Sequence, residues 1–324
     1  MDEKQQKKRL LWQLPFLTLL IVGSVLIIRQ QQSMPYQHDK GMVFGTLYNV
    51  TYQCEENLKP EIEAALREVD GEFSMFNDTS TVARFNRGEA VVESEMYREV
   101  YELAQTVNRE TDGAFDITVA PLVNAWGFGF KNEQMPTRHQ VDSLLKIRHQ
   151  YDYSAIAKGY GSEVVARLLR SHDVKNFMVE IGGEVVTQGI SEKRLPWKIG
   201  VTKPTDDSLA VSGELQTVLN VTDVSMATSG NYRNFYLKDG KKYAHTIDPK
   251  TGYPVQHSLL SATVLADNCA VADAYATSFM VMGMERAKAL LERHPELMAY
   301  FIYAKPDGTH GVWFSPSLQT KIAE

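Results

Sequence analysis

An uncharged stretch at residues 10–28 divides this chain into two unequal parts. Lys4, Lys7, Lys8 and Arg9 precede the stretch, and Arg29 closes it. Its nineteen residues would extend over about 28 Å as a helix, close to the thickness of a bilayer's hydrocarbon core. A buried helix of a soluble domain is the weaker interpretation, because the segment has no polar face. We therefore predict a cytoplasmic tip and one transmembrane signal anchor within residues 1–29.

The basic flank predicts the orientation of the rest of the chain. Positive residues beside a span tend to stay in the cytoplasm, so we expect a single-pass protein of the inner membrane with its larger part on the periplasmic side. A cleaved signal peptide is the alternative, but the stretch ends in Ile27, Ile28 and Arg29 rather than in a small-x-small site. Residues 30–41 are polar and contain Pro35, which predicts a linker before a globular domain at residues 42–324.

Charge and cysteine content exclude several classes of protein. The net charge is −6 and no long basic run follows the N-terminus, so nothing indicates a nucleic-acid partner. Cys54 and Cys269 are the two cysteines, without a CxxC motif or a Cys/His cluster. This pattern excludes a structural zinc site and a disulfide scaffold, and it leaves open a single bridge in an oxidising compartment.

Periodicity after residue 42 predicts a mixture of helices and strands. Consecutive strands outnumber strict strand–helix alternations, which favours an α+β fold of antiparallel sheets with packed helices. A hairpin is expected around Asp239 and Gly240. Helices are expected at 59–70, 95–110, 162–171, 268–282 and 284–293, and strands at 44–53, 177–181, 184–189, 197–201, 216–221, 261–265 and 299–303.

The chain lacks the common phosphate-loop, dinucleotide and hydrolase motifs, but five short segments are rich in Gly, Asp, Thr and aromatic residues. The first, at 111–129, has the sequence TDGAFDITVAPLVNAWGFG. It suits a wall for a planar ring, with Asp116 placed for a polar contact. The alternative is a turn-rich loop that buries Phe115 and Trp126 in the core.

The second and third segments suggest a close approach of a ligand to the backbone. Residues 155–163, AIAKGYGSE, place Lys158 among small residues where a helix begins, which suits a phosphate or carboxylate. A surface lysine beside a helix start remains the alternative. Residues 179–186, VEIGGEVV, carry paired glycines that indicate a bulge, a hairpin or a close approach.

The fourth and fifth segments carry candidates for catalysis and metal binding. Residues 227–255 include HTIDPKTGYPV, in which His245 is a candidate acid or base, or else a structural histidine. Residues 272–279, ADAYATSF, place Asp273 and Thr277 four residues apart, on one face of a helix. Their oxygens suit Mg²⁺, whereas a buried aspartate bonded to a neighbouring loop is the alternative.

Taken together and in this order, the segments resemble the ApbE family of FAD:protein FMN transferases, from about residue 43 to about residue 293. The resemblance implies an α+β fold related to the T-fold, FAD as flavin donor, Mg²⁺ as cofactor and AMP as a product. It also implies a threonine of a partner protein as acceptor, in flavin-carrying subunits of membrane redox complexes of the Nqr and Rnf types. An FAD pyrophosphatase that releases free FMN and AMP, or a non-enzymatic flavin-binding protein, remain alternatives.

The resemblance also implies roles for individual residues. His245 and Asp273 are expected to take part in catalysis, and a carbonyl of Gly161 is expected to join Asp273 and Thr277 as magnesium ligands. The chain departs from the family at Thr79, in an early loop where Asp is usual, which bears on transfer against hydrolysis. The implied FAD contacts are Phe44, Phe76, Ala114, Phe115, Asp116, Lys158, Glu163 and Ile247.

Overall fold

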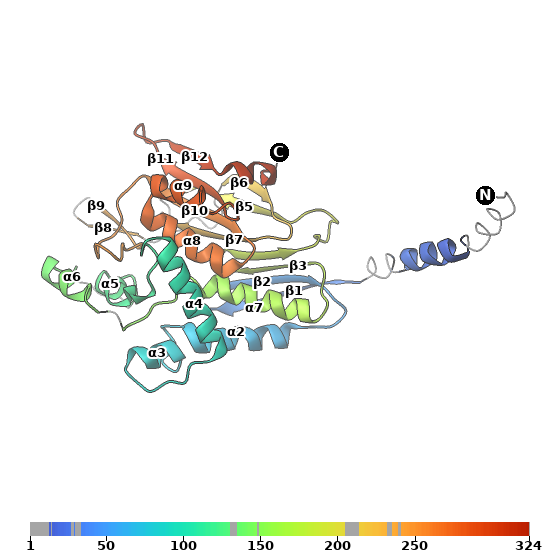
Figure 1. The fold of residues 1–324 in the computed structure, drawn as a ribbon, viewed down its shortest axis with the longest axis horizontal. Helices are drawn as coiled ribbons and strands as arrows, with labels where there is room; N and C mark the ends of the chain where they lie inside the picture. The colour runs from blue at the N-terminus through green and yellow to red at the C-terminus, as the bar shows by residue number, and fades with distance from the viewer. Residues whose placement is uncertain are drawn as a thin grey trace, which may run out of the picture.

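A computed structural model describes residues 13, 15–26, 29, 34–129, 135–147, 149–204, 214–231, 235–238 and 241–323. Its centre is an eight-stranded sheet in which every neighbouring pair of strands is antiparallel (Figure 1). In spatial order the strands are β1 (Tyr36–Val43), β2 (Thr46–Gln53), β3 (Phe177–Ile181), β4 (Glu184–Gln188), β7 (Ser225–Gly230), β10 (Leu259–Ala266), β11 (Met298–Ala304) and β12 (His310–Phe314).

Helices cover one face of this sheet, and a small sheet covers the other (Figure 1). The small sheet pairs β5 (Lys198–Thr202) with β6 (Leu215–Asn220), and the 3₁₀ helix η2 (Pro316–Lys321) packs beside it. A separate hairpin pairs β8 (Phe235–Lys238) with β9 (Lys241–Ala244). The helices are α2 (Lys59–Phe73), α3 (Thr81–Asn86), α4 (Glu95–Glu110), η1 (Ile117–Val119), α5 (Ala120–Ala125), α6 (Arg138–Leu144), α7 (Ala157–Ser171), α8 (Cys269–Met282) and α9 (Met284–Leu291).

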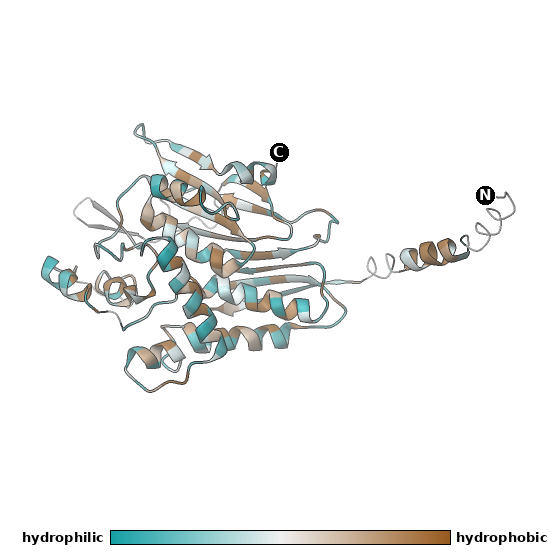
Figure 2. Cartoon of the chain, viewed as in Figure 1, coloured by the Kyte–Doolittle hydropathy of each residue, from teal (hydrophilic) through white to brown (hydrophobic). Residues whose placement is uncertain are grey.

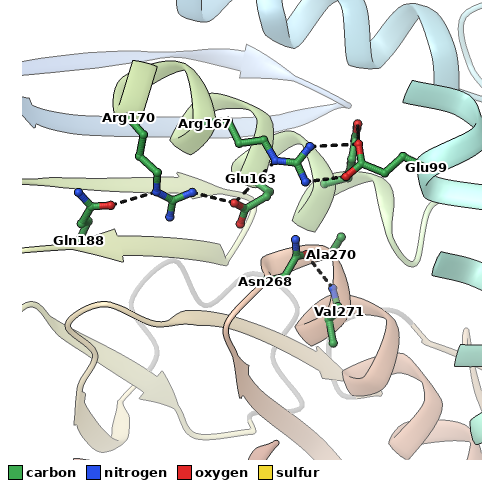
Figure 3. A network of polar contacts seen from close by, with 9 residues as sticks. Glu99, Glu163, Arg167, Arg170, Gln188, Asn268, Ala270 and Val271 are labelled. Carbon is green, nitrogen blue, oxygen red and sulfur yellow. Dashed lines mark hydrogen bonds and ion pairs between the residues drawn. The ribbon is translucent and has the colours of Figure 1, made fainter. Parts of the chain in front are cut away.

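Helix α8 lies at the centre of the helical layer. It is apolar almost all the way round, as expected of a helix with neighbours on every side, and eleven of its residues are buried. It packs on β7 and β10 below and against α7 and α4 beside it. Asn268 caps its first turn by accepting hydrogen bonds from the backbone N–H groups of Ala270 and Val271 (Figure 3). This burial holds the polar residues of α8 in fixed positions.

The α+β prediction is confirmed, and α4 and α8 have nearly the predicted limits. The predicted hairpin is also present as the β8–β9 pair, although its turn lies outside the described residues. Helix α7 begins at Ala157, five residues before the predicted start at 162. Its glycines permit close packing against α8, because a Cβ on Gly159 would lie 2.4 Å from the carbonyl oxygen of Cys269. Strand β7, which carries the segment ATSG, was not predicted.

The predicted linker at 30–41 is wrong over its second half, since β1 begins at Tyr36. Its polar composition reflects an edge strand, in which alternate side chains such as His38 and Lys40 face solvent. Asp39 points inward and accepts a hydrogen bond from the Tyr52 hydroxyl at 2.9 Å. Residues 30–33 of this expected linker lie outside the described residues.

The N-terminal segment is described at residues 13, 15–26 and 29. Residues 15–26 are helical and mostly hydrophobic (Figure 2). Their large apolar side chains, among them Phe16 and Leu19, are exposed. Among the described residues, no helix is both long and apolar enough to cross a membrane. The remainder of the predicted span at 10–28 lies outside the described residues.

Both cysteines are free, so the disulfide left open by the sequence is not formed. Cys269 is buried at the first turn of α8, and its thiol donates weakly to the carbonyl oxygens of Val185 and Met226. Cys54 is half-buried just after β2.

Candidate active site

A cavity of about 1030 Å³ opens between the helical layer, strands β2, β3, β4 and β7 of the central sheet, and the β5–β6 sheet. This volume is at the upper end of small-molecule sites, so the cavity can hold a ligand the size of a dinucleotide. The segments that line it come from distant parts of the chain: residues 46–49, 75–76, 114–119, 152–158, 182–185, 198–202, 228–230, 245–249 and, on α8, Asp273, Thr277 and Val281.

Helix α8 presents Asp273 and Thr277 to the cavity, as their spacing predicted. Asp273 is 2% exposed, and its Oδ2 accepts a hydrogen bond from the backbone N–H of Gly159 at 3.0 Å. Burial raises the pKa of the Asp273 carboxyl, although the Lys158 charge and the Gly159 N–H oppose this shift. The Thr277 and Ser229 hydroxyl oxygens lie 3.1 Å apart, which joins α8 to β7.

Lys158, in the first turn of α7, forms an ion pair with Glu184 across the cavity wall, with Nζ 2.5 Å from Oε1. Burial lowers the lysine pKa, but the charges of Asp273 and Glu184 more than offset this and raise it overall. Burial, opposed by Lys158 and assisted by Asp273, raises the pKa of Glu184 to about 8. The second carboxylate oxygen of Glu184 is buried without a hydrogen-bond partner.

The segment at 111–129 forms one wall of the cavity through Ala114, Phe115 and Asp116. Phe115 is buried in the main core, and its carbonyl accepts a hydrogen bond from Asn108. Asp116 begins η1, where its Oδ1 accepts from the backbone N–H and hydroxyl of Thr118 at 2.8 and 2.7 Å. The segment therefore forms the cavity wall that we predicted, and it also buries Phe115 in the core, as the alternative interpretation predicted.

Aromatic and apolar residues border this end of the cavity. Phe76 lines it while 69% of the side chain is exposed, as expected for a residue available to cover a ligand. His245 and Ile247 also line the cavity, and the His245 ring lies edge-on to Phe128 with centroids 6.3 Å apart. Trp126 fixes the neighbouring turn by donating from Nε1 to the carbonyl oxygen of Gly252 at 2.7 Å.

Three of the expected site residues lie outside the cavity lining. The Phe44 ring packs against the backbone of α7, where a Cβ on Gly161 would approach it to 2.8 Å. Glu163 is 5% exposed and does not line the cavity. Its Oε1 binds Arg170 at 2.8 Å and lies 4.0 Å from Arg167 (Figure 3). The roles that the resemblance implies for Phe44 and Glu163 as FAD contacts and for the Gly161 carbonyl as a magnesium ligand stay predictions.

Three acidic residues that line the cavity, Asp152, Glu180 and Glu184, were not predicted as site residues. Glu184 lies in the segment at 179–186, which was interpreted from its paired glycines alone and not from the carboxylate beside them. Asp152 precedes the quoted segment at 155–163, and burial raises its pKa. Its Oδ1 accepts the Ser154 N–H at 2.8 Å, and its own N–H donates to the carbonyl of Ile117. The sequence signal that could have identified these residues was a charged side chain beside an apolar run.

The oxygen donors of the cavity suit a hard divalent cation. Asp273 supplies a buried carboxylate and Thr277 a hydroxyl, whereas the carboxylate of Glu184 pairs with Lys158. Such donors match Mg²⁺, which commonly takes one or two carboxylates and completes its shell with water and substrate phosphates. Within the described part of the chain, no group of three His, Cys, Asp or Glu side chains could hold a metal by itself.

Known proteins are similar to this chain over most of its length. The ApbE family model matches residues 44–301. An FAD:protein FMN transferase of Vibrio cholerae is 36% identical over 86% of this chain and 92% of its own length, and one of Escherichia coli is 33% identical over 87% and 88%. The solved flavin transferase ApbE of Vibrio cholerae superposes with a TM-score of 0.80 at 33% identity, covering 89% of this chain and 99% of that one.

Proposed function

This chain belongs to the ApbE family, and from that membership and the cavity we propose that it is a magnesium-dependent FAD:protein FMN transferase. It cleaves FAD and joins FMN through its phosphate to a threonine of a partner protein. The observation that carries the proposal is the meeting of Lys158, Glu184, Asp273 and Thr277 in one dinucleotide-sized cavity.

The reaction forms one bond and breaks one. The threonine oxygen attacks the FMN phosphorus, the bond from that phosphorus to the bridging oxygen breaks, and AMP leaves with that oxygen. Asp273 and Thr277 would hold Mg²⁺, which when bound neutralises charge on the pyrophosphate. Lys158 contributes a further positive charge for a phosphate oxygen.

The remaining residues position the substrates and move the proton. A threonine hydroxyl is a weak nucleophile, so it needs a nearby base, and His245 lines the same cavity. Ala114, Phe115 and Phe76 form an apolar wall and cover that suit the flavin ring. Bringing the hydroxyl and the phosphorus together in fixed positions supplies much of the acceleration.

Anchoring to the inner membrane is part of the proposal. It is supported by the uncharged stretch at 10–28, its basic flank and the exposed apolar side chains at 16–26. The acceptors would be periplasmic, flavin-carrying subunits of membrane redox complexes, such as the Nqr and Rnf types. We expect the full chain in the membrane fraction and a chain without residues 1–29 in the soluble fraction; equal partitioning of the two would contradict the anchor.

The activity is tested by incubating the protein with FAD, Mg²⁺ and an acceptor domain with a threonine motif. We expect the intact mass of the acceptor to rise by that of FMN less one water, with one AMP released per adduct. The isosteric variant Asp273→Asn should lose roughly 100-fold or more in rate while its melting temperature stays near that of the parent. AMP formed equally fast without acceptor would indicate a pyrophosphatase, and intact FAD would indicate a binding protein.

A further inference from the structure

Lys158 lies close to two buried carboxyl groups of the cavity, Glu184 and Asp273. Glu184 is 1% exposed and Asp273 is 2% exposed. The ion pair of Lys158 is with Glu184, at 2.5 Å. Asp273 is nearby as well, because its Oδ2 accepts from the backbone N–H of Gly159, the residue that follows the lysine. The Lys158 ammonium therefore lies where the carboxylate of either residue could bind it.

The fold directs the lysine toward Glu184. The turn between β3 and β4 contains Gly182 and Gly183, whose φ angles of 63° and 109° favour glycine. The lysine stem passes over this turn, since a Cβ on Gly182 would lie 3.3 Å from Lys158 Cδ. Glu184 follows directly as the first residue of β4, and its carbonyl accepts a hydrogen bond from Ser162 of α7 at 3.2 Å. Strand β4 and helix α7 therefore hold the Lys158–Glu184 ion pair in position.

This arrangement matters because a lysine ammonium and a divalent cation compete for the same carboxylate. Residues that orient metal ligands without touching the metal commonly change metal affinity strongly. We infer that Glu184 is a positioning residue, which holds the Lys158 ammonium away from Asp273 and so leaves Asp273 available to Mg²⁺. The inference rests on the proposed function, because it assumes that the cation binds at Asp273.

The test replaces the carboxyl group of Glu184 by an amide and then removes the Lys158 ammonium that competes with Mg²⁺ for Asp273. In Glu184→Gln the lysine turns to Asp273, and Mg²⁺ affinity, measured by calorimetry without FAD, should fall roughly 10- to 100-fold. Adding Lys158→Met, which has a similar length and no charge, should return much of that affinity. Glu99→Gln is the control: Glu99 pairs with Arg167 at 2.6 Å outside the cavity lining, so its loss should leave Mg²⁺ affinity unchanged.

The double variant separates this role from the alternatives. If Glu184 were a metal ligand or only a structural support, Glu184→Gln/Lys158→Met would bind Mg²⁺ as weakly as Glu184→Gln, and the inference would be overturned. Unchanged affinity in Glu184→Gln would overturn it too. If Glu184→Gln does not fold, Glu184→Asp gives the same comparison: weaker binding that Lys158→Met restores supports the inference, and unchanged binding refutes it.

Failure of the proposed function has a different signature. A parent protein that binds no Mg²⁺ would remove the metal role and this inference together. A parent that binds Mg²⁺ and transfers FMN, beside a Glu184→Gln variant with equal Mg²⁺ affinity, would leave the proposed function standing and overturn the inference alone.

Discussion

Substituting alanine for Gly159 tests the closeness of α7 and α8, on which the position of Asp273 depends. An added Cβ would lie 2.4 Å from the Cys269 carbonyl oxygen and 2.8 Å from the Asp273 Cβ. Ordinary contact begins near 3.4 Å, so one helix must move by about 1 Å. The nearest atom belongs to the backbone, which cannot turn aside as a flexible side chain would.

Two opposing effects set the size of the change in stability. Alanine favours the helix by about 1 kcal/mol over glycine. Overpacking costs about 1–3 kcal/mol, and weakening the bond from Gly159 N–H to the Asp273 carboxylate costs about 1.5–3 kcal/mol. The costs exceed the gain, so we expect Gly159→Ala to destabilise the protein by about 1.5–5 kcal/mol. The melting temperature should fall by about 2 °C per kcal/mol.

The matched control is Gly71→Ala, in the last turn of α2, where no atom lies within 4 Å of the added Cβ. Only the higher helix propensity of alanine over glycine acts at this position, so this variant should be more stable than the parent by about 0.5–1 kcal/mol. Thermal melts of the two variants should therefore shift in opposite directions. FMN transfer should fall by about 100-fold in Gly159→Ala, because a shift of about 1 Å displaces Asp273. A Gly159→Ala variant as stable and as active as Gly71→Ala would refute the reasoning.

Three further predictions follow from the structure. Phe76→Ala should raise KM for FAD with little change in melting temperature, because the ring is 69% exposed; an unchanged KM would deny it a role as cover. The raised pKa of Glu184, about 8 against an ordinary 4.5, favours the uncharged form in the folded state. Its contribution to the stability of the metal-free protein is therefore full below about pH 4.5 and lost as the pH rises toward 8, so thermal melts should fall over that interval and fall less in Glu184→Gln. The free Cys54 and Cys269 predict two reactive thiols per chain after denaturation without reductant, and a count of none would contradict the structure.

Local patterns in the sequence were sufficient for the helices that bury one regular face and for the main ligand candidates. Helix α4 follows the 3.6-residue apolar period over its predicted limits, 95–110. The spacing of Asp273 and Thr277 placed both side chains on one face of α8 before the partners of that helix were known. Such features depend on residues within one or two helical turns, so the sequence contains all the information they need.

Tertiary packing decided the features that depend on distant partners. Glu163 and Glu184 are both buried glutamates beside glycine-rich segments, yet Glu163 pairs with Arg170 away from the cavity and Glu184 pairs with Lys158 inside it. The polar segment from Tyr36 became a strand because β2 lies beside it. The sequence alone determined the chemical types available at the site, whereas the packing of α7, α8 and β4 decided which charges meet, since partners 26 and 114 residues apart leave no local pattern.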